Sequence, residues 1–108
     1  MFGLSGETIS LINEIFSGYP EIEKAIIYGS RARGDYKNGS DIDLTIIGDV
    51  SVEDKIQIAG LIDDLPIPYM CDLSVLGHIK NENLVEHIHR VGQVFYENPG
   101  KQEKALAG

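Results

Sequence analysis

The chain has 108 residues, of which 43% are hydrophobic and 24% are charged. This length suffices for one domain with a single core, and the composition is typical of a globular protein in water. The formal net charge of −8 argues against direct nucleic-acid binding, which requires a surface rich in lysine and arginine. The sequence shows no signal peptide and no apolar run of membrane-spanning length, so we expect a cytoplasmic protein without membrane contact.

The first half of the chain predicts a helix followed by two strands around a polar turn. Apolar residues recur at helical spacing from Leu4 to Phe16, and Ser5 is a candidate N-terminal cap. The apolar run Lys24–Tyr28 predicts the first strand, and Arg31–Gly34 a short helical turn. After a polar loop, Ser40–Ile47 predicts the second strand.

The second half predicts two more helices and a third strand. Ser51 with an aspartate three residues later resembles a capping box and begins a helix that two prolines end. Tyr69–Leu76 predicts the third strand, and Asn81 is a candidate cap of the last helix. The segment Val94–Tyr96 fits either a short strand or an extended arm.

This order of elements predicts an α/β (α+β) fold, namely a small mixed β-sheet with helices packed on one side. We expect one folded domain over residues 1–96. Residues 97–108 are polar and are expected to form a mobile C-terminal tail.

One stretch in the middle of the chain, GSRARGDYKNGSDID, carries the pattern G-S-x10-D-x-D. Gly29 ends a predicted buried strand, where a glycine lets the chain turn sharply and lets a ligand come close. Ser30 can cap a short helical turn whose free N–H groups suit a phosphate. Asp41 and Asp43 lie two apart on a predicted strand, so their carboxylates project from one face about 7 Å apart at Cα.

Two neighbouring carboxylates repel each other, and a hard cation such as Mg²⁺ removes that penalty. Taken alone, Asp41 and Asp43 would equally fit a solvated strand face with two ordinary surface acids. Asp72 lies in the third predicted strand among apolar residues, where an isolated carboxylate would cost several kcal/mol unless it were paired or bound to metal. A phosphate cradle beside a carboxylate metal site indicates phosphoryl or nucleotidyl transfer. His87 and His89 point about 200° apart on a helix and are expected to be surface residues that share no ion.

The motif, together with the Arg31–Gly34 segment, resembles the signature of the minimal nucleotidyltransferases, a branch of the polymerase beta-type nucleotidyltransferase superfamily. Asp72 fits the third carboxylate of that family. The resemblance implies the polymerase beta-type fold over residues 1–96. It also implies that Asp41 and Asp43 are the principal metal ligands and that Asp72 binds a second Mg²⁺ ion and helps to deprotonate the attacking hydroxyl.

By this resemblance the protein transfers AMP from ATP, or from another nucleoside triphosphate, to a hydroxyl acceptor. Gly29 and Ser30 are the candidate nucleotide-binding residues for the terminal phosphates. Arg31 and Arg33 lie beside them and either neutralise the triphosphate or pair with nearby acids, and the sequence does not decide between these roles.

Minimal members of the family commonly work with a helical HEPN-type RNase toxin, to whose tyrosine they attach AMP as antitoxins. The resemblance therefore implies such a partner and a homo- or hetero-oligomer. Two alternatives stay open: transfer to a small hydroxylated molecule such as an aminoglycoside, and a non-catalytic antitoxin that masks its partner sterically. The expected mark of the latter is loss of a motif carboxylate, and all are present here.

Overall fold

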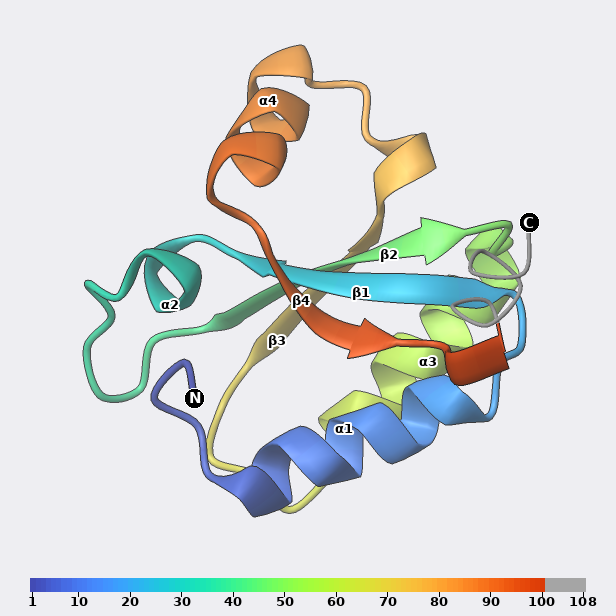
Figure 1. Ribbon diagram of the computed structural model, residues 1–108. Helices are drawn as coiled ribbons and strands as arrows, with labels where there is room; N and C mark the ends of the chain where they lie inside the picture. The colour runs from blue at the N-terminus through green and yellow to red at the C-terminus, as the bar shows by residue number, and fades with distance from the viewer. Residues whose placement is uncertain (101–108) are drawn as a thin grey trace.

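The structure is a computed structural model that describes residues 1–100. Within this range the helices and strands follow the predicted order, with a 3₁₀ turn added after the third strand (Figure 1). In chain order the elements are α1 (Gly6–Ser17), β1 (Ile22–Tyr28), α2 (Ser30–Arg33), β2 (Ile42–Gly48), α3 (Val52–Asp63), β3 (Cys71–Val75), the 3₁₀ turn η1 (Leu76–His78), α4 (Glu82–Val91) and β4 (Gln93–Glu97).

The strands form one mixed sheet in the order β3-β2-β1-β4. Strand β1 is antiparallel to both β2 and β4, whereas β2 and β3 are parallel. The parallel pair requires a long crossover, and α3 lies in that connection. Because β4 pairs with β1, the segment that fitted either a strand or an arm is a strand. Residues 101–108 of the expected tail lie outside the described residues.

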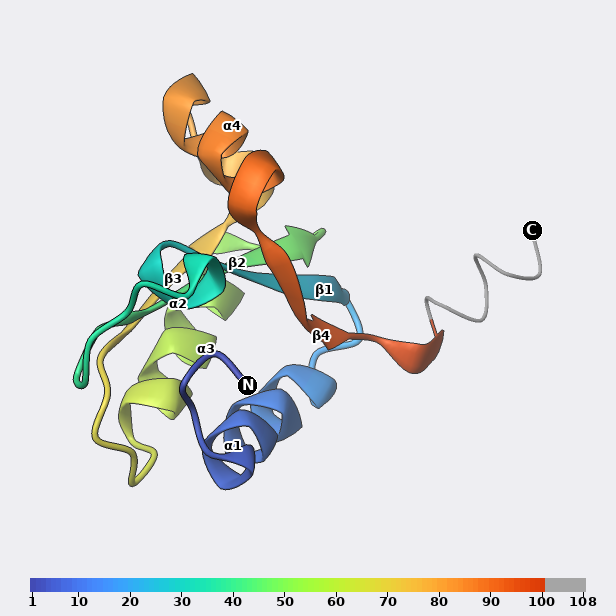
Figure 2. The ribbon, with the colours of Figure 1, turned by 60° about the vertical axis from the view of Figure 1, so that its left-hand side comes forward.

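One face of the sheet is apolar, and α1 and α3 cover it (Figures 1 and 2). Neighbouring strands bring Ile27, Leu44 and Leu73 into one row of this face, and all three are buried. Fully burying such a side chain contributes about 1.5–3 kcal/mol. A one-residue slip of β2 would move its apolar side chains into water, so this face fixes the strand register. The core also contains Ile12, Phe16, Ala25, Ile46, Ile58, Ile62 and Val75.

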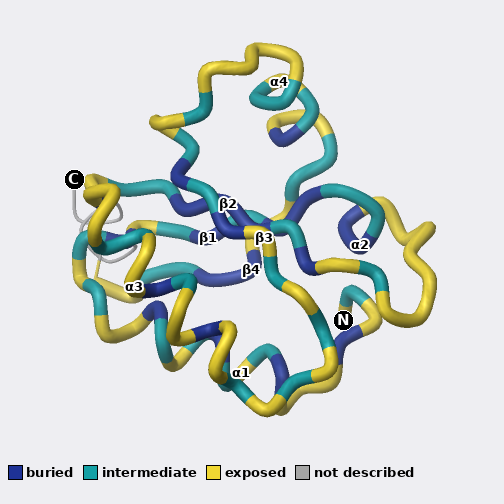
Figure 3. Tube along the Cα trace, turned by 180° about the vertical axis from the view of Figure 1, so that it is seen from behind, coloured by how far each residue is buried: buried dark blue, intermediate teal, exposed yellow. Residues whose placement is uncertain are grey.

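The opposite face carries α4 alone among the three long helices (Figure 1). The expectation of helices on one side therefore holds for α1 and α3, while α4 stands over the other face. Figure 3 shows the buried segments running along the strands, whereas the loop that follows α2 is exposed. No helix among residues 1–100 is long and apolar enough to cross a membrane.

The predicted caps are present at all three long helices. The side chains of Ser5, Ser51 and Asn81 each accept a hydrogen bond from the backbone N–H three residues later, at 3.1 to 3.2 Å. Each cap satisfies a donor that the first helical turn leaves free. The helix starts were therefore readable from single residues in the sequence.

Candidate active site

The turn between β1 and α2 is shaped by a glycine that no other residue could replace without strain. Gly29 has φ +74° and ψ −155°, a backbone region that is essentially restricted to glycine. A Cβ atom on Gly29 would also collide with the carboxylate of Asp43. Gly29 itself occupies the N-cap position of α2, and Ser30 is the first helical residue. The expectation that Ser30 caps the turn was thus wrong by one residue, because only the glycine can adopt the turn conformation.

Sheet register brings two of the predicted acids side by side. Asp43 of β2 lies opposite Tyr28 of β1 and opposite Asp72 of β3. Partners in a row project from the same face, and neighbouring strands lie about 4.8 Å apart. Asp41 precedes β2 by one residue and, like Asp72, is exposed, whereas Asp43 is half-buried. The predicted alternation is confirmed, because Ile42 and Leu44, on either side of Asp43, are fully buried.

The charges at this face influence one another. Burial raises the pKa of Asp43 above its ordinary value, and the negative charges of Asp72 and Asp41 raise it further. His87 acts in the opposite direction and lowers this pKa. A carboxylate that is half-buried beside two others is stabilised by a cation, since the cation removes both the repulsion and part of the desolvation cost.

The donor set fits a hard divalent cation such as Mg²⁺, which prefers carboxylate oxygens. Among residues 1–100, no group of three histidine, cysteine, aspartate or glutamate side chains is close enough together to coordinate a metal ion without other ligands. Mg²⁺ is generally held by one or two protein carboxylates together with substrate phosphates, so a preformed cage is not required. The arrangement therefore fits a metal that enters with a phosphate ligand.

Asp72 lies in a different environment from the one that its sequence neighbours suggested. We expected a carboxylate among apolar side chains, but Asp72 is exposed. Leu73 and Val75 are buried because they point to the core, while alternation along β3 turns Asp72 to the other face. The desolvation cost of a buried carboxylate therefore gives no reason to expect a metal at Asp72. Asp72 belongs to the site because it is the register partner of Asp43.

Tyr28 is the last residue of β1 and lies opposite Asp43, next to the turn. Its side chain is buried. Burial raises the pKa of Tyr28, a hydrogen bond with Ser74 lowers it, and the charges of Asp72 and Asp43 raise it again. Ser74 also donates a hydrogen bond of 2.9 Å to the hydroxyl of Thr45, which is fully buried. A polar layer thus lies under the carboxylates, and no sequence motif indicated it.

The sequence predicts His87 at the surface, but the structure places its ring against Tyr28. His87 is half-buried, and its ring meets the ring of Tyr28 edge-on, with centroids 6.3 Å apart and planes at 82°. His89, two positions later, is exposed as expected. A signal was available, because His87 lies three residues after Leu84 in the stripe that Leu84, Ile88 and Val91 define on α4.

Arg31, whose role the sequence left open, makes structural contacts with the backbone and with two aromatic rings. Its side chain is only 3% exposed. Nε and Nη2 donate to the carbonyl of Ser40 at 3.0 and 2.8 Å, and Nη1 donates to the carbonyl of Phe2 at 2.9 Å. The guanidinium also lies over the rings of Tyr36 and Tyr69, 5.2 and 4.8 Å from their centroids. Arg31 therefore ties α2 to the residue that precedes Asp41.

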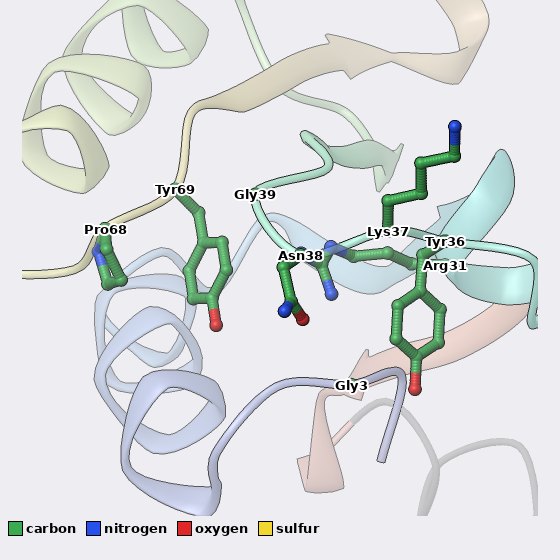
Figure 4. Close-up of a pocket in the computed structure, with 8 residues that line it drawn as sticks. All are labelled: Gly3, Arg31, Tyr36, Lys37, Asn38, Gly39, Pro68 and Tyr69. Carbon is green, nitrogen blue, oxygen red and sulfur yellow. The ribbon is translucent and has the colours of Figure 1, made fainter.

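Figure 4 shows the Arg31 guanidinium reaching between the two tyrosine rings, at the edge of a cavity of about 400 Å³. None of the site carboxylates lines this cavity. Arg33 is exposed and lies 3.3 Å from the carboxylate of Asp35, so the pairing that the sequence left open is present. The cavity is lined by Gly3, Arg31, Tyr36, Lys37, Asn38, Gly39, Pro68 and Tyr69.

A match to a known protein family shows to which family this chain belongs. The family model "Polymerase beta, Nucleotidyltransferase" matches residues 10–101, which is most of the chain. The chain belongs to this nucleotidyltransferase family. The match includes Gly29, Ser30, Asp41, Asp43 and Asp72, and it confirms the resemblance on which the sequence analysis relied. The protein is accordingly a nucleotidyltransferase with the polymerase beta-type fold.

Three known proteins are similar to this chain in sequence or in fold. A protein of Methanocaldococcus jannaschii, named provisionally as a protein adenylyltransferase, is 46% identical over 48 residues, which are 44% of this chain and 48% of that protein. The chain thus matches about half the length of that relative. A toxin-antitoxin crystal structure with AMP-PNP has a TM-score of 0.68 at 17% identity, covering 96% of this chain and 83% of the other.

The third relative is the structure of a tri-AMPylated HEPN toxin of Shewanella oneidensis in complex with its MNT antitoxin. It has a TM-score of 0.64 at 16% identity and covers 93% of this chain and 76% of the other. At such low identity the two solved structures establish the shared fold alone.

Proposed function

We propose that this nucleotidyltransferase transfers AMP from ATP to a hydroxyl, and that the acceptor is a tyrosine of a HEPN-type toxin that it neutralises as an antitoxin. The main support is the row Tyr28–Asp43–Asp72, which sets two carboxylates beside the turn at Gly29. The choice of AMP is supported by the provisional name of the archaeal relative. The choice of acceptor is supported by the fold shared with a structure that contains an AMPylated HEPN toxin.

In this proposal Asp41, Asp43 and Asp72 would hold two magnesium ions, which would neutralise negative charge on the triphosphate and on pyrophosphate. The turn at Gly29 and Ser30 receives the terminal phosphates, since a residue without a side chain lets the backbone approach them. This division leaves few other groups for the protein to supply, because positioning and charge neutralisation dominate phosphoryl-group transfer.

The acceptor hydroxyl attacks the α-phosphorus, so that a new P–O bond forms while the bond to pyrophosphate breaks. Asp72 accepts the proton of the hydroxyl, because it is exposed to an incoming acceptor and lies next to Asp43. Asp43, whose pKa is raised by burial and by its acidic neighbours, gains most from binding a cation. Arg33, exposed at the end of α2, is proposed to exchange its partner Asp35 for a phosphate when the nucleotide binds.

The decisive experiment uses ATP labelled at the α-phosphate, Mg²⁺ and the purified protein encoded by the adjacent gene. We expect label on a tyrosine of that protein and none when the label is at the γ-phosphate. Asp43→Asn should abolish transfer. Asp49→Asn is the matched control, because Asp49 is an exposed acid beyond the other end of the same strand and should transfer normally.

The other outcomes identify the alternatives. Co-purification of the two proteins without transfer of label would favour steric masking. Label on an aminoglycoside and none on protein would favour the small-molecule acceptor. Transfer that persists after EDTA treatment would contradict the role of magnesium.

A further inference from the structure

Helix α4 is held firmly over the face that carries the carboxylates (Figures 1 and 2). Ile88 of α4 is buried, and the helix ends at Gly92, where an added Cβ would collide with the side chain of Ile26 and the carbonyl of Ile88. The chain then enters β4 directly, and β4 pairs with β1. Residues on the inner side of α4 therefore have a fixed position relative to β1.

His87 lies on that inner side. Its edge-on contact with Tyr28 places the imidazole above the end of β1, and Tyr28 is the register partner of Asp43. His89 is exposed and two positions further along the helix, so it faces away.

Within residues 1–100 the imidazole of His87 makes no side-chain hydrogen bond, so its N–H group is available to a ligand. Two basic side chains of the motif already have partners, Arg31 with backbone carbonyls and Arg33 with Asp35.

We propose that His87 contacts the substrate, with its imidazole N–H donating a hydrogen bond to a phosphate oxygen at the reacting phosphoryl group above Asp43. This inference rests on the proposed function. The triphosphate would then be held from two sides, by the turn at Gly29–Ser30 and by α4. A donor aimed at charge that develops during transfer lowers the barrier more than it tightens binding.

Four variants separate this role from simple packing against Tyr28. His87→Ala removes both the ring and the donor, and His87→Phe keeps an edge-on ring without the donor. His87→Gln keeps a donor without the ring. His89→Ala is the matched control on the same helix. All four are first compared with the wild type by thermal unfolding, so that activities are read from folded protein.

We expect His87→Ala and His87→Phe to lower kcat for AMP transfer by about 10-fold or more, with KM for ATP changed less than about 3-fold. His87→Gln should recover a measurable part of the lost kcat, and His89→Ala should stay within about 2-fold of the wild type. A His87→Phe variant as active as the wild type would overturn the proposal and leave His87 a packing role.

A second measurement does not depend on turnover. The ¹H–¹⁵N signals of the two imidazoles, assigned with His87→Gln and His89→Ala, are followed during titration with Mg²⁺ and AMP-PNP. We expect the His87 signal to shift and the His89 signal to stay. If AMP-PNP binds, as seen by calorimetry, and the His87 signal does not move, the inference is wrong while the proposed function stands. Absence of nucleotide binding in the wild type would instead refute the proposed function.

Discussion

Gly29→Ala offers the most direct test of how the turn and the carboxylates depend on each other. An alanine would have to adopt φ +74° and ψ −155°, which costs about 1–3 kcal/mol for a residue with a side chain. Its Cβ would also collide with the Asp43 carboxylate. Turning that side chain out of its rotamer adds about 0.5–1.5 kcal/mol. We expect the free energy of unfolding to fall by about 1.5–4.5 kcal/mol.

The assay is urea unfolding at pH 7 followed by circular dichroism, with the midpoint and slope analysed by linear extrapolation. Gly60→Ala is the matched control, because Gly60 lies inside α3 and an added Cβ there meets nothing within 4 Å. This control should gain about 0.5–1 kcal/mol through helix propensity. AMP transfer should be lost in Gly29→Ala and kept in Gly60→Ala.

A double-mutant cycle with Asp43→Ala separates the two contributions. Without the carboxylate, the nearest Asp43 atom to a new Cβ on Gly29 is the Asp43 Cβ at 3.7 Å, an ordinary contact. The collision term should therefore vanish in the double variant while the backbone term remains, giving a coupling energy of about 0.5–1.5 kcal/mol. An unfolding midpoint for Gly29→Ala equal to that of the wild type, or a coupling energy of zero, would refute this account of the turn.

Two further predictions concern the charges of the site. Burial and acidic neighbours raise the folded-state pKa of Asp43 above 3.8, so its ionisation costs stability as the pH rises through that raised pKa. Asp43→Asn should therefore be more stable than the wild type at pH 7 and gain nothing at pH 3; a constant difference in unfolding free energy at both pH values would contradict this. Arg31→Lys should lower the unfolding free energy by about 2–4 kcal/mol, because one ammonium cannot replace the paired bonds to Ser40 and the contacts with two tyrosine rings. Arg33→Lys, whose charge is exposed, should change it by less than about 0.5 kcal/mol, and equal losses in the two variants would argue against the tie.

Much of the fold could be predicted because local signals agreed with one another. The caps at Ser5, Ser51 and Asn81 marked helix starts, and alternating apolar residues marked β2. Residue spacing in the motif predicted Asp41 and Asp43 on one strand, and the structure has Asp43 in β2 while Asp41 precedes that strand by one residue. What the sequence could not supply was the register between β2 and β3, which sets Asp72 beside Asp43.

Three features escaped the sequence because they depend on partners far along the chain. Arg31 is held by a carbonyl of Phe2, 29 positions away, and by the ring of Tyr69. His87 meets the site only because α4 docks on the face opposite to α1 and α3. Asp72 joins Asp43 only because β3 pairs in parallel with β2, 29 positions earlier in the chain.

The interleaving of two kinds of residue along β2 has a consequence for engineering. Ile42 and Leu44 are buried in the core, whereas Asp43 between them projects from the opposite face beside Asp72. Random libraries over this strand would mostly yield unfolded or inert proteins. Residues 37–39 are exposed and lie outside the core, so substitutions there should leave the fold intact.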